Sequence, residues 1–314
     1  MSPPASALAL PGGPRSALLG ADLRPSPAWR ARLRRIPAAR NACSVASVWA
    51  QAALVVGAAV RLGHPAAYAT AFLLMGRTHA QLLSLMHEAA HRLLLPSRRA
   101  NDWVGRWLVG YPALTNVDGY RRVHMAHHRE EFGPDEPDVP LYAHYPITRA
   151  SLARKLLRDA LGVTGLRMLR DQLRGLRSDV PVVRDTQRRI LAVQAAMWGA
   201  CALAGAWWVW PLLWLGPYLT VWRVINRLRS IAEHGGLRAD PDRRATTHSV
   251  RQGPLARFGL VPYGIGWHMA HHLDPGVPFR ALPRYHAELR ASGAISDALE
   301  WPSYRACWRA LCAG

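Results

Sequence analysis

The sequence predicts an all-α membrane protein with four transmembrane helices and a cytoplasmic helical cap. Two uncharged stretches indicate the transmembrane helices: 20 residues over 41–60 and 33 residues over 190–222. A bilayer needs about 20 mostly apolar residues per helix. A buried core helix accounts poorly for an uncharged run as long as the second one. The third observation is that eight of the fourteen histidines stand in three short clusters.

The two uncharged stretches and the segment after the first of them provide the spans. We expect these at about 43–62, 66–86, 190–209 and 211–231. The second span tolerates Arg77 and His79. The longer stretch is divided at Pro211, because proline interrupts a helix. The tryptophan-rich turn at 207–214 then lies at the membrane interface, where tryptophan is enriched.

Arginines set the orientation of the spans. Only Arg61 flanks the connection between the first two spans, and the arginines before the first span are Arg30, Arg32, Arg34, Arg35 and Arg40. Cytoplasmic flanks carry the excess of basic residues, so the N-terminus is expected in the cytoplasm. Arg223, Arg227 and Arg229 mark the return after the fourth span. Four crossings then place both termini and all three histidine clusters on the cytoplasmic side.

Segments outside the spans have distinct compositions. Residues 1–28 are rich in Pro, Ala, Gly and Ser, with no basic residue before the apolar patch at 7–10. They predict a flexible tail and not a signal peptide. Residues 103–115 are apolar but too short and too broken by Gly and Pro to cross, which indicates a re-entrant or interfacial segment. At the other end, 291–314 predicts an amphipathic C-terminal helix with an aromatic face.

A basic amphipathic segment lies between the second and third spans. Leucines and valines recur at helical spacing over 149–177, with eight basic residues among them. The pattern favours a pair of helices on the membrane surface. The alternative is a solvated helix pair in a soluble lobe.

The net charge of +20 is carried almost wholly by arginine, since Lys155 is the sole lysine. Such a charge suits nucleic acid or an anionic membrane surface. No nucleic-acid-binding motif accompanies it, so a membrane surface is the better partner. The four cysteines form no CxxC pair and indicate neither a disulfide framework nor a thiolate metal site.

The histidine clusters are the strongest functional signal. His87 and His91 form an HxxxH box, and HMAHH occurs twice, at 124–128 and 268–272. Residues three and four apart share a helix face, so each box can direct its imidazoles to one point. A lone histidine is usually a packing residue, but clustering has no packing rationale, since buried imidazoles must all find partners. Eight imidazoles exceed what one ion binds, which suggests two transition metals.

Three alternatives compete with this interpretation. His87, Glu88 and His91 also form the HExxH of a membrane zinc metalloprotease, which would leave six clustered histidines without a role. The Glu88 and His91 pair is one half of a carboxylate di-iron motif, but no second such pair exists. A metal transporter or haem-bearing electron carrier would place histidines inside the spans, where only His79 stands.

The chain resembles the membrane fatty acid desaturase and hydroxylase superfamily in four features. These are HEAAH at 87–91, the two HMAHH boxes, the AEHGG segment around His234, and the LDPGVPFRALPRYH that follows the last box. The resemblance covers about 45–290 and suggests a desaturase-like domain over 29–290. It implies four membrane helices and a cytoplasmic cap holding two non-haem iron ions in an all-histidine shell. Carried over to this chain, the metal ligands are His87, His91, His124, His127, His128, His234, His268, His271 and His272.

One position departs from the family pattern. Acyl-CoA desaturases have an asparagine one helical turn before the lone histidine, where this chain has Ser230, with Asn226 a turn further back. An acyl-lipid or another substrate is therefore favoured over acyl-CoA.

The resemblance implies O2-dependent oxidation of an unactivated C–H bond. Desaturation of a fatty acyl chain is the first expectation and hydroxylation the second, because the outcome depends on substrate placement that the sequence does not give. Electrons must come from outside, since the chain has no HPGG, cysteine cluster or GxGxxG. A ferredoxin or cytochrome with its reductase is the expected partner, and an arginine-rich face suits an acidic one.

Overall fold

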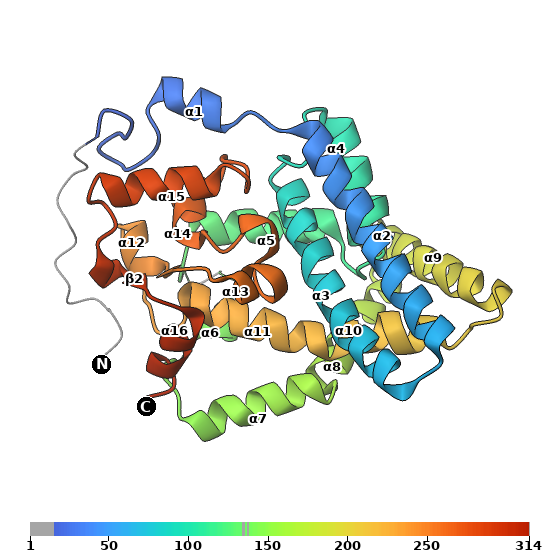
Figure 1. Ribbon diagram of the computed structural model, residues 1–314. Coiled ribbons are helices and arrows are strands. Elements are labelled where there is room, and N and C mark those ends of the chain that lie inside the picture. The colour runs from blue at the N-terminus through green and yellow to red at the C-terminus, as the bar shows by residue number, and fades with distance from the viewer. Residues whose placement is uncertain (1–15, 134–135, 137, 314) are drawn as a thin grey trace. The chain divides into compact units, whose positions relative to one another are not determined.

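The computed structural model describes residues 16–133, 136 and 138–313. In this part of the chain the structure is mostly helical, with one two-residue pair of parallel strands, β1 (Ser249–Val250) and β2 (Glu300–Trp301) (Figure 1). The all-α prediction is confirmed. The chain divides into two compact units, which we name the hairpin unit (37–120 and 154–226) and the histidine-rich unit (up to 36, 121–153 and from 227).

The hairpin unit is built on the antiparallel helices α2 (Ala38–Leu62) and α3 (Pro65–Ala90). The turn between them is encoded locally. Gly63 ends α2 in the left-handed conformation (φ 62°), which glycine adopts without strain. The His64 side chain then accepts a hydrogen bond from the Ala66 N–H (3.2 Å), and Pro65 starts α3.

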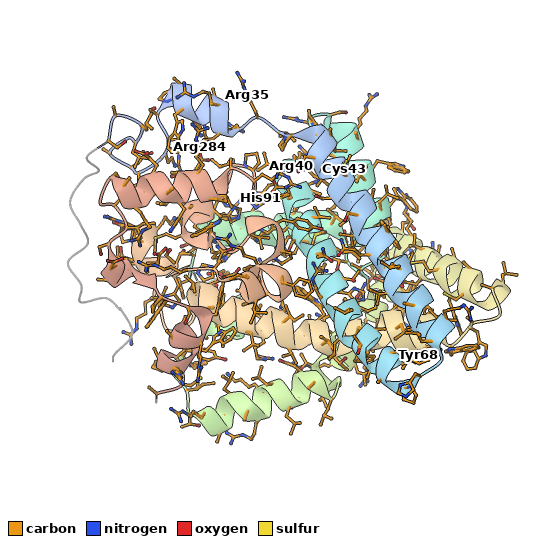
Figure 2. The ribbon with its side chains drawn as sticks, in the orientation of Figure 1. Arg35, Arg40, Cys43, Tyr68, His91 and Arg284 are labelled. Atoms are coloured by element: carbon orange, nitrogen blue, oxygen red, sulfur yellow. The ribbon has the colours of Figure 1, made fainter. Side chains whose placement is uncertain are left out.

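The far end of the hairpin carries the first histidine box. Figure 2 shows Tyr68 and His91 at opposite ends of α3. A buried asparagine closes this end: Asn101 donates to the Ala89 carbonyl (2.9 Å) and accepts from the Leu94 N–H (3.1 Å). These bonds satisfy backbone groups that a helix terminus leaves open.

Beyond α4 (Arg98–Val104), the predicted re-entrant segment is a π-helix (Gly105–Gly110) followed by turns. Its irregular carbonyls are satisfied by buried side chains. Gln194 donates to the carbonyls of Tyr111 (2.7 Å) and Pro112 (2.9 Å), and Trp214 donates to Pro112 (2.9 Å). Buried backbone away from water needs such partners.

The remaining helices of the hairpin unit differ in their bounds from the predicted spans. Helix α9 (Pro181–Leu203) begins and ends earlier than the predicted span. It ends earlier because Gly205 turns the chain at φ 72°. Pro211 does not break a helix. It stands in the first turn of a π-helix (Trp210–Leu215), where its missing N–H costs nothing, and α10 (Gly216–Leu219) and α11 (Val221–His234) follow.

The predicted amphipathic pair is present as α7 (Arg149–Ala160) and α8 (Val163–Arg174), followed by a short 3-10 turn (Gly175–Arg177). Apolar side chains on this pair are exposed, including Leu157 (58%) on α7 and Leu166 (56%) on α8. Helix α8 packs closely on α10 at Gly165, where an added Cβ would lie 2.1 Å from the Leu219 carbonyl oxygen.

The histidine-rich unit contains short helices around its histidines. In chain order they are α1 (Pro27–Leu33), the end of α5 (Val117–Arg129), α6 (Val139–Tyr142), the end of α11, α12 (Arg243–Thr246), α13 (Pro254–Gly259), a 3-10 turn (Pro262–Gly264), α14 (His268–Leu273), α15 (Leu282–Ala291), a 3-10 turn (Asp297–Leu299) and α16 (Tyr304–Ala310).

Of the predicted flexible tail, residues 1–15 lie outside the described residues, whereas the part from Ser16 is packed: Leu19 and Leu23 are buried, and the Tyr285 hydroxyl donates to the Leu23 carbonyl (2.8 Å). The helix that follows is held as well. Arg30 forms a bidentate ion pair with the buried Asp274 (2.5 and 2.9 Å), and Trp29 packs edge-on against Tyr285. The C-terminal helix is shorter than the predicted 291–314. It is anchored by the Trp308 indole, which donates to the Leu228 carbonyl (2.8 Å).

Only one stretch of the described helices, within Pro27–Leu62, meets the length and apolarity needed to cross a membrane. Only 22% of its apolar window is buried, unlike the core helix of a soluble protein. The four-span topology therefore stays a prediction.

Candidate metal centre

Histidines from three helices converge in the histidine-rich unit. Helix α5 carries the second box near its end, α11 ends on the lone histidine, and α14 consists almost entirely of the third box. The members brought together are His127, His234, His268 and His272, whose ligand atoms all lie within 4.8 Å of one another. All four side chains are buried. We name them the four-histidine group.

In three of these histidines the outward nitrogen, Nδ1, donates to a protein acceptor, whereas Nδ1 of His268 is buried and makes no hydrogen bond within the described residues. His127 donates to Glu136 Oε1 (2.5 Å), His272 donates to Glu131, and His234 donates to the Thr246 carbonyl (2.8 Å). His268 Nδ1 lies 3.5 Å from Glu233 Oε1. A metal-ligating histidine typically donates its other ring N–H to a carboxylate or carbonyl.

The inward nitrogens crowd together. His234 Nε2 lies 2.9 Å from His268 Nε2, and the Nε2 of His272 is buried without a hydrogen-bond partner. With a proton fixed on Nδ1, Nε2 presents a lone pair to the centre of the group. The donor set and its orphaned nitrogen fit a transition-metal cation.

The remaining box histidines lie beside this group or in the other unit. His128 Nε2 is 3.1 Å from His124 Nε2, and the ring centroids of His128 and His271 are 4.6 Å apart. In the hairpin unit, the rings of His87 and His91 lie 4.7 Å apart at the end of α3. The second and third boxes are thus divided, because His127, His268 and His272 join the four-histidine group while His124, His128 and His271 lie beside it. The prediction that each box directs all its imidazoles to one point holds only in part.

The electrostatic environment favours the neutral imidazole, which is the form that binds metals, in three of the four histidines of the group. Burial, and then neighbouring cationic groups, holds the pKa values of His234, His268 and His272 well below the ordinary histidine value. For His127, burial alone would lower the pKa, but the hydrogen bond to Glu136 and its charge raise it. Neutral imidazole is the form that binds metals.

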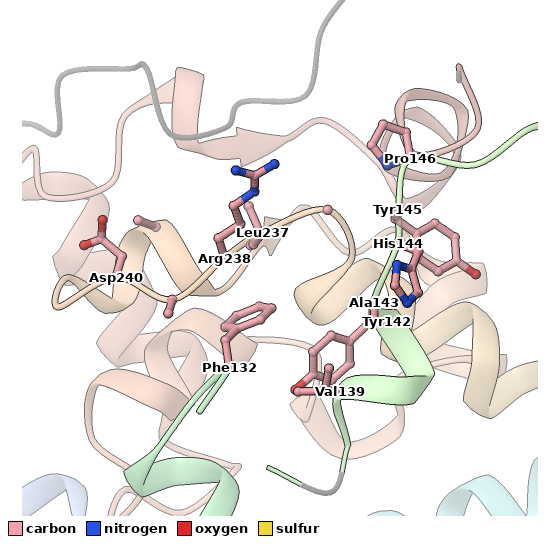
Figure 3. Close-up of a pocket in the computed structure, with 13 residues that line it drawn as sticks. Phe132, Val139, Tyr142, Ala143, His144, Tyr145, Pro146, Leu237, Arg238 and Asp240 are labelled. Carbon is pink, nitrogen blue, oxygen red and sulfur yellow. The ribbon is translucent and has the colours of Figure 1, made fainter. Parts of the chain in front are cut away.

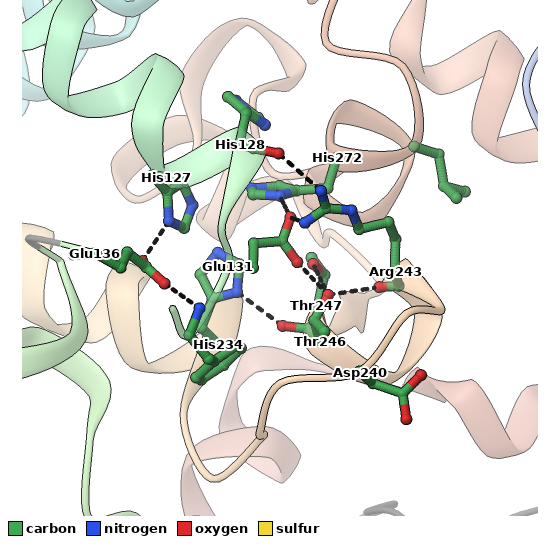
Figure 4. Close-up of polar contacts among 12 residues, drawn as sticks. His127, His128, Glu131, Glu136, His234, Asp240, Arg243, Thr246, Thr247 and His272 are labelled. Carbon is green, nitrogen blue, oxygen red and sulfur yellow. Dashed lines mark hydrogen bonds and ion pairs between the residues drawn. The ribbon is translucent and has the colours of Figure 1, made fainter. Parts of the chain in front are cut away.

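Figure 4 shows two carboxylates behind the group that the sequence analysis missed, Glu131 and Glu136, with Thr246 and Arg243 around the first. A signal was present, because an acidic run (REEFGPDEPD) follows the second box directly. Thr246 and Arg243 come from a segment more than a hundred residues later and carry no motif.

The other buried histidines have structural partners. His248 Nε2 donates to the Gly235 carbonyl (2.8 Å) and its Nδ1 accepts from the Trp301 indole, while burial lowers its pKa to about 4. His79 bonds the Trp214 carbonyl (2.9 Å) and packs on two aromatic rings, as expected of a helix-packing residue.

A cavity of about 680 Å³ opens next to His234 (Figure 3). Its walls come from 142–146 and 236–240, and Phe132 and Tyr142 form the side towards the histidine. Their ring centroids lie 6.0 and 5.0 Å from that of His234. Arg238 and His144 stand at its exposed side.

Comparison with known proteins agrees with this geometry. The profile of the family described as "Fatty acid desaturase" matches residues 63–304. Dihydrorhizobitoxine desaturase from Bradyrhizobium elkanii is 26% identical over 233 residues, which cover 68% of this chain and 65% of that protein, so the match spans slightly less than two thirds of the relative. A family of desaturases leaves the zinc metalloprotease alternative without support. The match over 63–304 spans every histidine box and the lone His234, and the chain therefore belongs to the fatty acid desaturase family.

Proposed function

We propose that this protein is an O2-dependent desaturase that introduces a double bond into a fatty acyl chain at a non-haem di-iron centre. The observation that carries the proposal is the four-histidine group: buried imidazoles from three helices converge, and the outward nitrogens of three of them are fixed by acceptors. Family membership supports oxidative desaturase chemistry.

The proposed metal ligands are the eight box histidines and His234. Iron bound there would supply the activation of O2 that oxidation of an unactivated C–H bond needs. The protein's own contribution is to hold the Nδ1 proton of His127, His234 and His272 on an acceptor, so that Nε2 remains available. Burial of the group excludes bulk water, which protects a reactive oxidant from side reactions.

Apolar side chains of the hairpin unit support a membrane location and a lipid-like substrate. Leu54, Leu73 and Leu203 are 73%, 62% and 93% exposed, an arrangement suited to contact with lipid. We propose four crossings with both termini and the histidine boxes in the cytoplasm. An acyl chain would then reach the centre from the bilayer.

The substrate is the least constrained part of the proposal. The relative is named for dihydrorhizobitoxine and not for a fatty acid, and the Ser230 departure argues against acyl-CoA. We therefore propose an acyl-lipid as the first substrate to test. Electrons would come from a ferredoxin or a cytochrome with its reductase, attracted by the basic surface.

Membranes carrying the protein should be incubated with ferredoxin, reductase, NADPH, labelled O2 and a panel of acyl-lipids, with dihydrorhizobitoxine as a further substrate. A desaturase consumes O2 and leaves no label in the organic product, whereas a hydroxylase leaves label in an alcohol. Labelled alcohol as the main product would replace desaturation by hydroxylation. Turnover without O2 would overturn both.

A further inference from the structure

Two buried carboxylates stand directly behind the four-histidine group, Glu131 just after α5 and Glu136 in the loop that follows. Their side chains are 1% and 0% exposed. A buried carboxylate is costly unless it is paired and hydrogen-bonded. The hydrogen-bond partners of each carboxylate therefore indicate what role the buried charge has.

Glu131 joins three segments of the unit. Its Oε1 accepts from His272 Nδ1 and pairs with Arg243 Nη1 (2.6 Å), while its Oε2 accepts from the Thr246 hydroxyl. Arg243 also donates to the His128 carbonyl (2.8 Å). Both oxygens are thus held, and the carboxylate plane is fixed relative to His272.

Glu136 has a parallel arrangement. Its Oε1 accepts from His127 Nδ1 (2.5 Å) and from the Tyr142 hydroxyl, and its Oε2 accepts from the Phe132 N–H. Again both oxygens are occupied, and one partner is a histidine of the group. The two carboxylates therefore support one histidine each from two different boxes.

The other two histidines of the group have weaker outward partners. His234 donates to a neutral carbonyl, that of Thr246. Glu233 lies 3.5 Å from His268 Nδ1, and Arg229 Nε binds the same carboxylate oxygen at 2.6 Å. The group is thus divided between two imidazoles that donate to a carboxylate, His127 and His272, and two that do not.

We propose that Glu131 and Glu136 are positioning residues that orient His272 and His127 for metal binding and make them the strongest donors of the group. A full negative charge on the far side of an imidazole raises its basicity as a ligand and fixes the tautomer that presents Nε2. This inference rests on the proposed metal-binding function. Nothing in it requires either carboxylate to touch the metal.

The test compares Glu131→Gln and Glu136→Gln with Glu130→Gln in the full-length protein. Glutamine keeps the size and one acceptor oxygen but removes the charge. Glu130 is the exposed neighbour in the same acidic run, so it controls for a change of net charge near the site. Metal-free protein is titrated with Co²⁺ or Fe²⁺ against a competing chelator, and the visible spectrum of the Co²⁺ form is recorded.

We expect each of the two variants at buried positions to bind one metal equivalent about 10- to 100-fold more weakly than wild type, with a shifted Co²⁺ spectrum. Glu130→Gln should match wild type. Unchanged affinity and spectrum in both buried variants would overturn the inference. Lower thermal stability of the metal-free protein with unchanged metal affinity would show a merely structural role and would also overturn it.

Two milder variants keep the test decisive if a glutamine variant fails to fold. Tyr142→Phe and Thr246→Val each remove one donor from a carboxylate while leaving its charge and its histidine in place. We expect a smaller loss of affinity with the same direction of spectral change, and no change would contradict the inference. If wild-type protein itself binds neither Co²⁺ nor Fe²⁺, the proposed function fails instead.

Discussion

His234 illustrates how a single residue outside any box can belong to the centre. It is the last residue of α11, and its ring is held between the Thr246 carbonyl and His268. The two glycines that follow permit this. A Cβ on Gly235 would lie 2.4 Å from the Ile231 carbonyl oxygen, and Gly236 has φ 76°. The chain can therefore turn away immediately after the imidazole.

Replacement of this histidine should remove one metal ion. We expect His234→Ala to lose about half of the bound iron and nearly all turnover, because the four-histidine group would lose one of its four nitrogen donors. Iron content by atomic emission, with O2 consumption, measures both. His64→Ala, which alters an exposed helix cap, should keep its iron. Full iron content and activity in His234→Ala would refute the ligand assignment.

Glu300 is a residue with a purely structural role in the same unit. Its buried carboxylate accepts from His286 Nε2 (2.8 Å), Arg251 Nε (2.8 Å) and Ser249 Oγ (3.2 Å), and pairs with Arg290. Burial alone would raise the pKa of Glu300, but the hydrogen bonds from His286 and Arg251 lower it to about 2. The charged form is thus bound by the folded state.

Because the folded pKa lies below the ordinary value of about 4.3, this carboxylate stabilises the fold fully above about pH 5. Its contribution is lost as the pH falls towards 2. We expect Glu300→Gln to lower the free energy of unfolding by on the order of 2 kcal/mol near neutral pH. The difference in stability between this variant and wild type should shrink as the pH is lowered. Thermal unfolding in detergent across pH measures this gap. Asp171→Asn, which breaks an exposed ion pair with Arg174, should have little effect, and a gap independent of pH would contradict the assignment.

At this scale the sequence was informative where chemistry repeats at short spacing. Histidines three and four apart share a helix face, so the clustering within each box could be predicted from residue numbers, but the division of the second and third boxes between His127, His268 and His272 on one side and the other box histidines could not. Glu131, Thr246 and Arg243 could not be predicted as one cluster, because 115 residues separate the glutamate from the threonine. Such a contact depends on how the chain returns to the site.

Among the elements, the contact of α8 with α10 depends on the absence of a side chain at one position. An added Cβ at Gly165 would meet backbone atoms of Leu219 at 2.1 to 2.8 Å. Backbone atoms cannot rotate away, so the helices would have to separate. The contact therefore holds α8, with its exposed apolar side chains, against α10.

We expect Gly165→Ala to destabilise the protein by about 1–3 kcal/mol through overpacking. Gly199→Ala is the matched control, because it is also helical and an added Cβ there meets nothing within 4 Å. It should be neutral or stabilising by up to about 1 kcal/mol, since alanine favours helix. The measurement is the unfolding midpoint of both variants in the same detergent. Equal midpoints would show that the two helices do not depend on this contact.

Element boundaries were predicted less well than element existence. The uncharged run was divided at Pro211, but the chain turns at Gly205 and the proline begins the next helical segment. Both residues interrupt helices in isolation, and composition does not decide which one does so. The sequence predicts a broken apolar segment where the structure has a π-helix at Gly105–Gly110, because the turn after it is held by Gln194 and Trp214 from distant positions.

For the whole molecule, the distribution of apolar surface and of arginine must be explained together. Exposed leucines are concentrated in the hairpin unit, with Leu54, Leu62 and Leu73 each more than 60% exposed on α2 and α3. Arginines cluster before α2 and are sparse at the turn between the two helices. An apolar hairpin with one basic end is the pattern that a membrane helix pair needs for a fixed orientation.

This pattern makes the orientation testable by cysteine labelling of intact cells. The natural cysteines, Cys43, Cys201, Cys307 and Cys312, are first replaced by alanine. Leu62→Cys then reports the turn between α2 and α3, and Asp179→Cys reports the exposed connection before α9.

An impermeant maleimide should label position 62 without permeabilisation, because only Arg61 stands near it and the turn is expected outside. Position 179 should label only after permeabilisation, since it follows the basic helices α7 and α8, which are expected on the cytoplasmic surface. Labelling of 179 but not 62 in intact cells would invert the topology and put the histidine boxes outside, away from any cytoplasmic reductase. Labelling of both would leave α2 and α3 as a hairpin that does not cross, and the acyl chain would need another route to the four-histidine group.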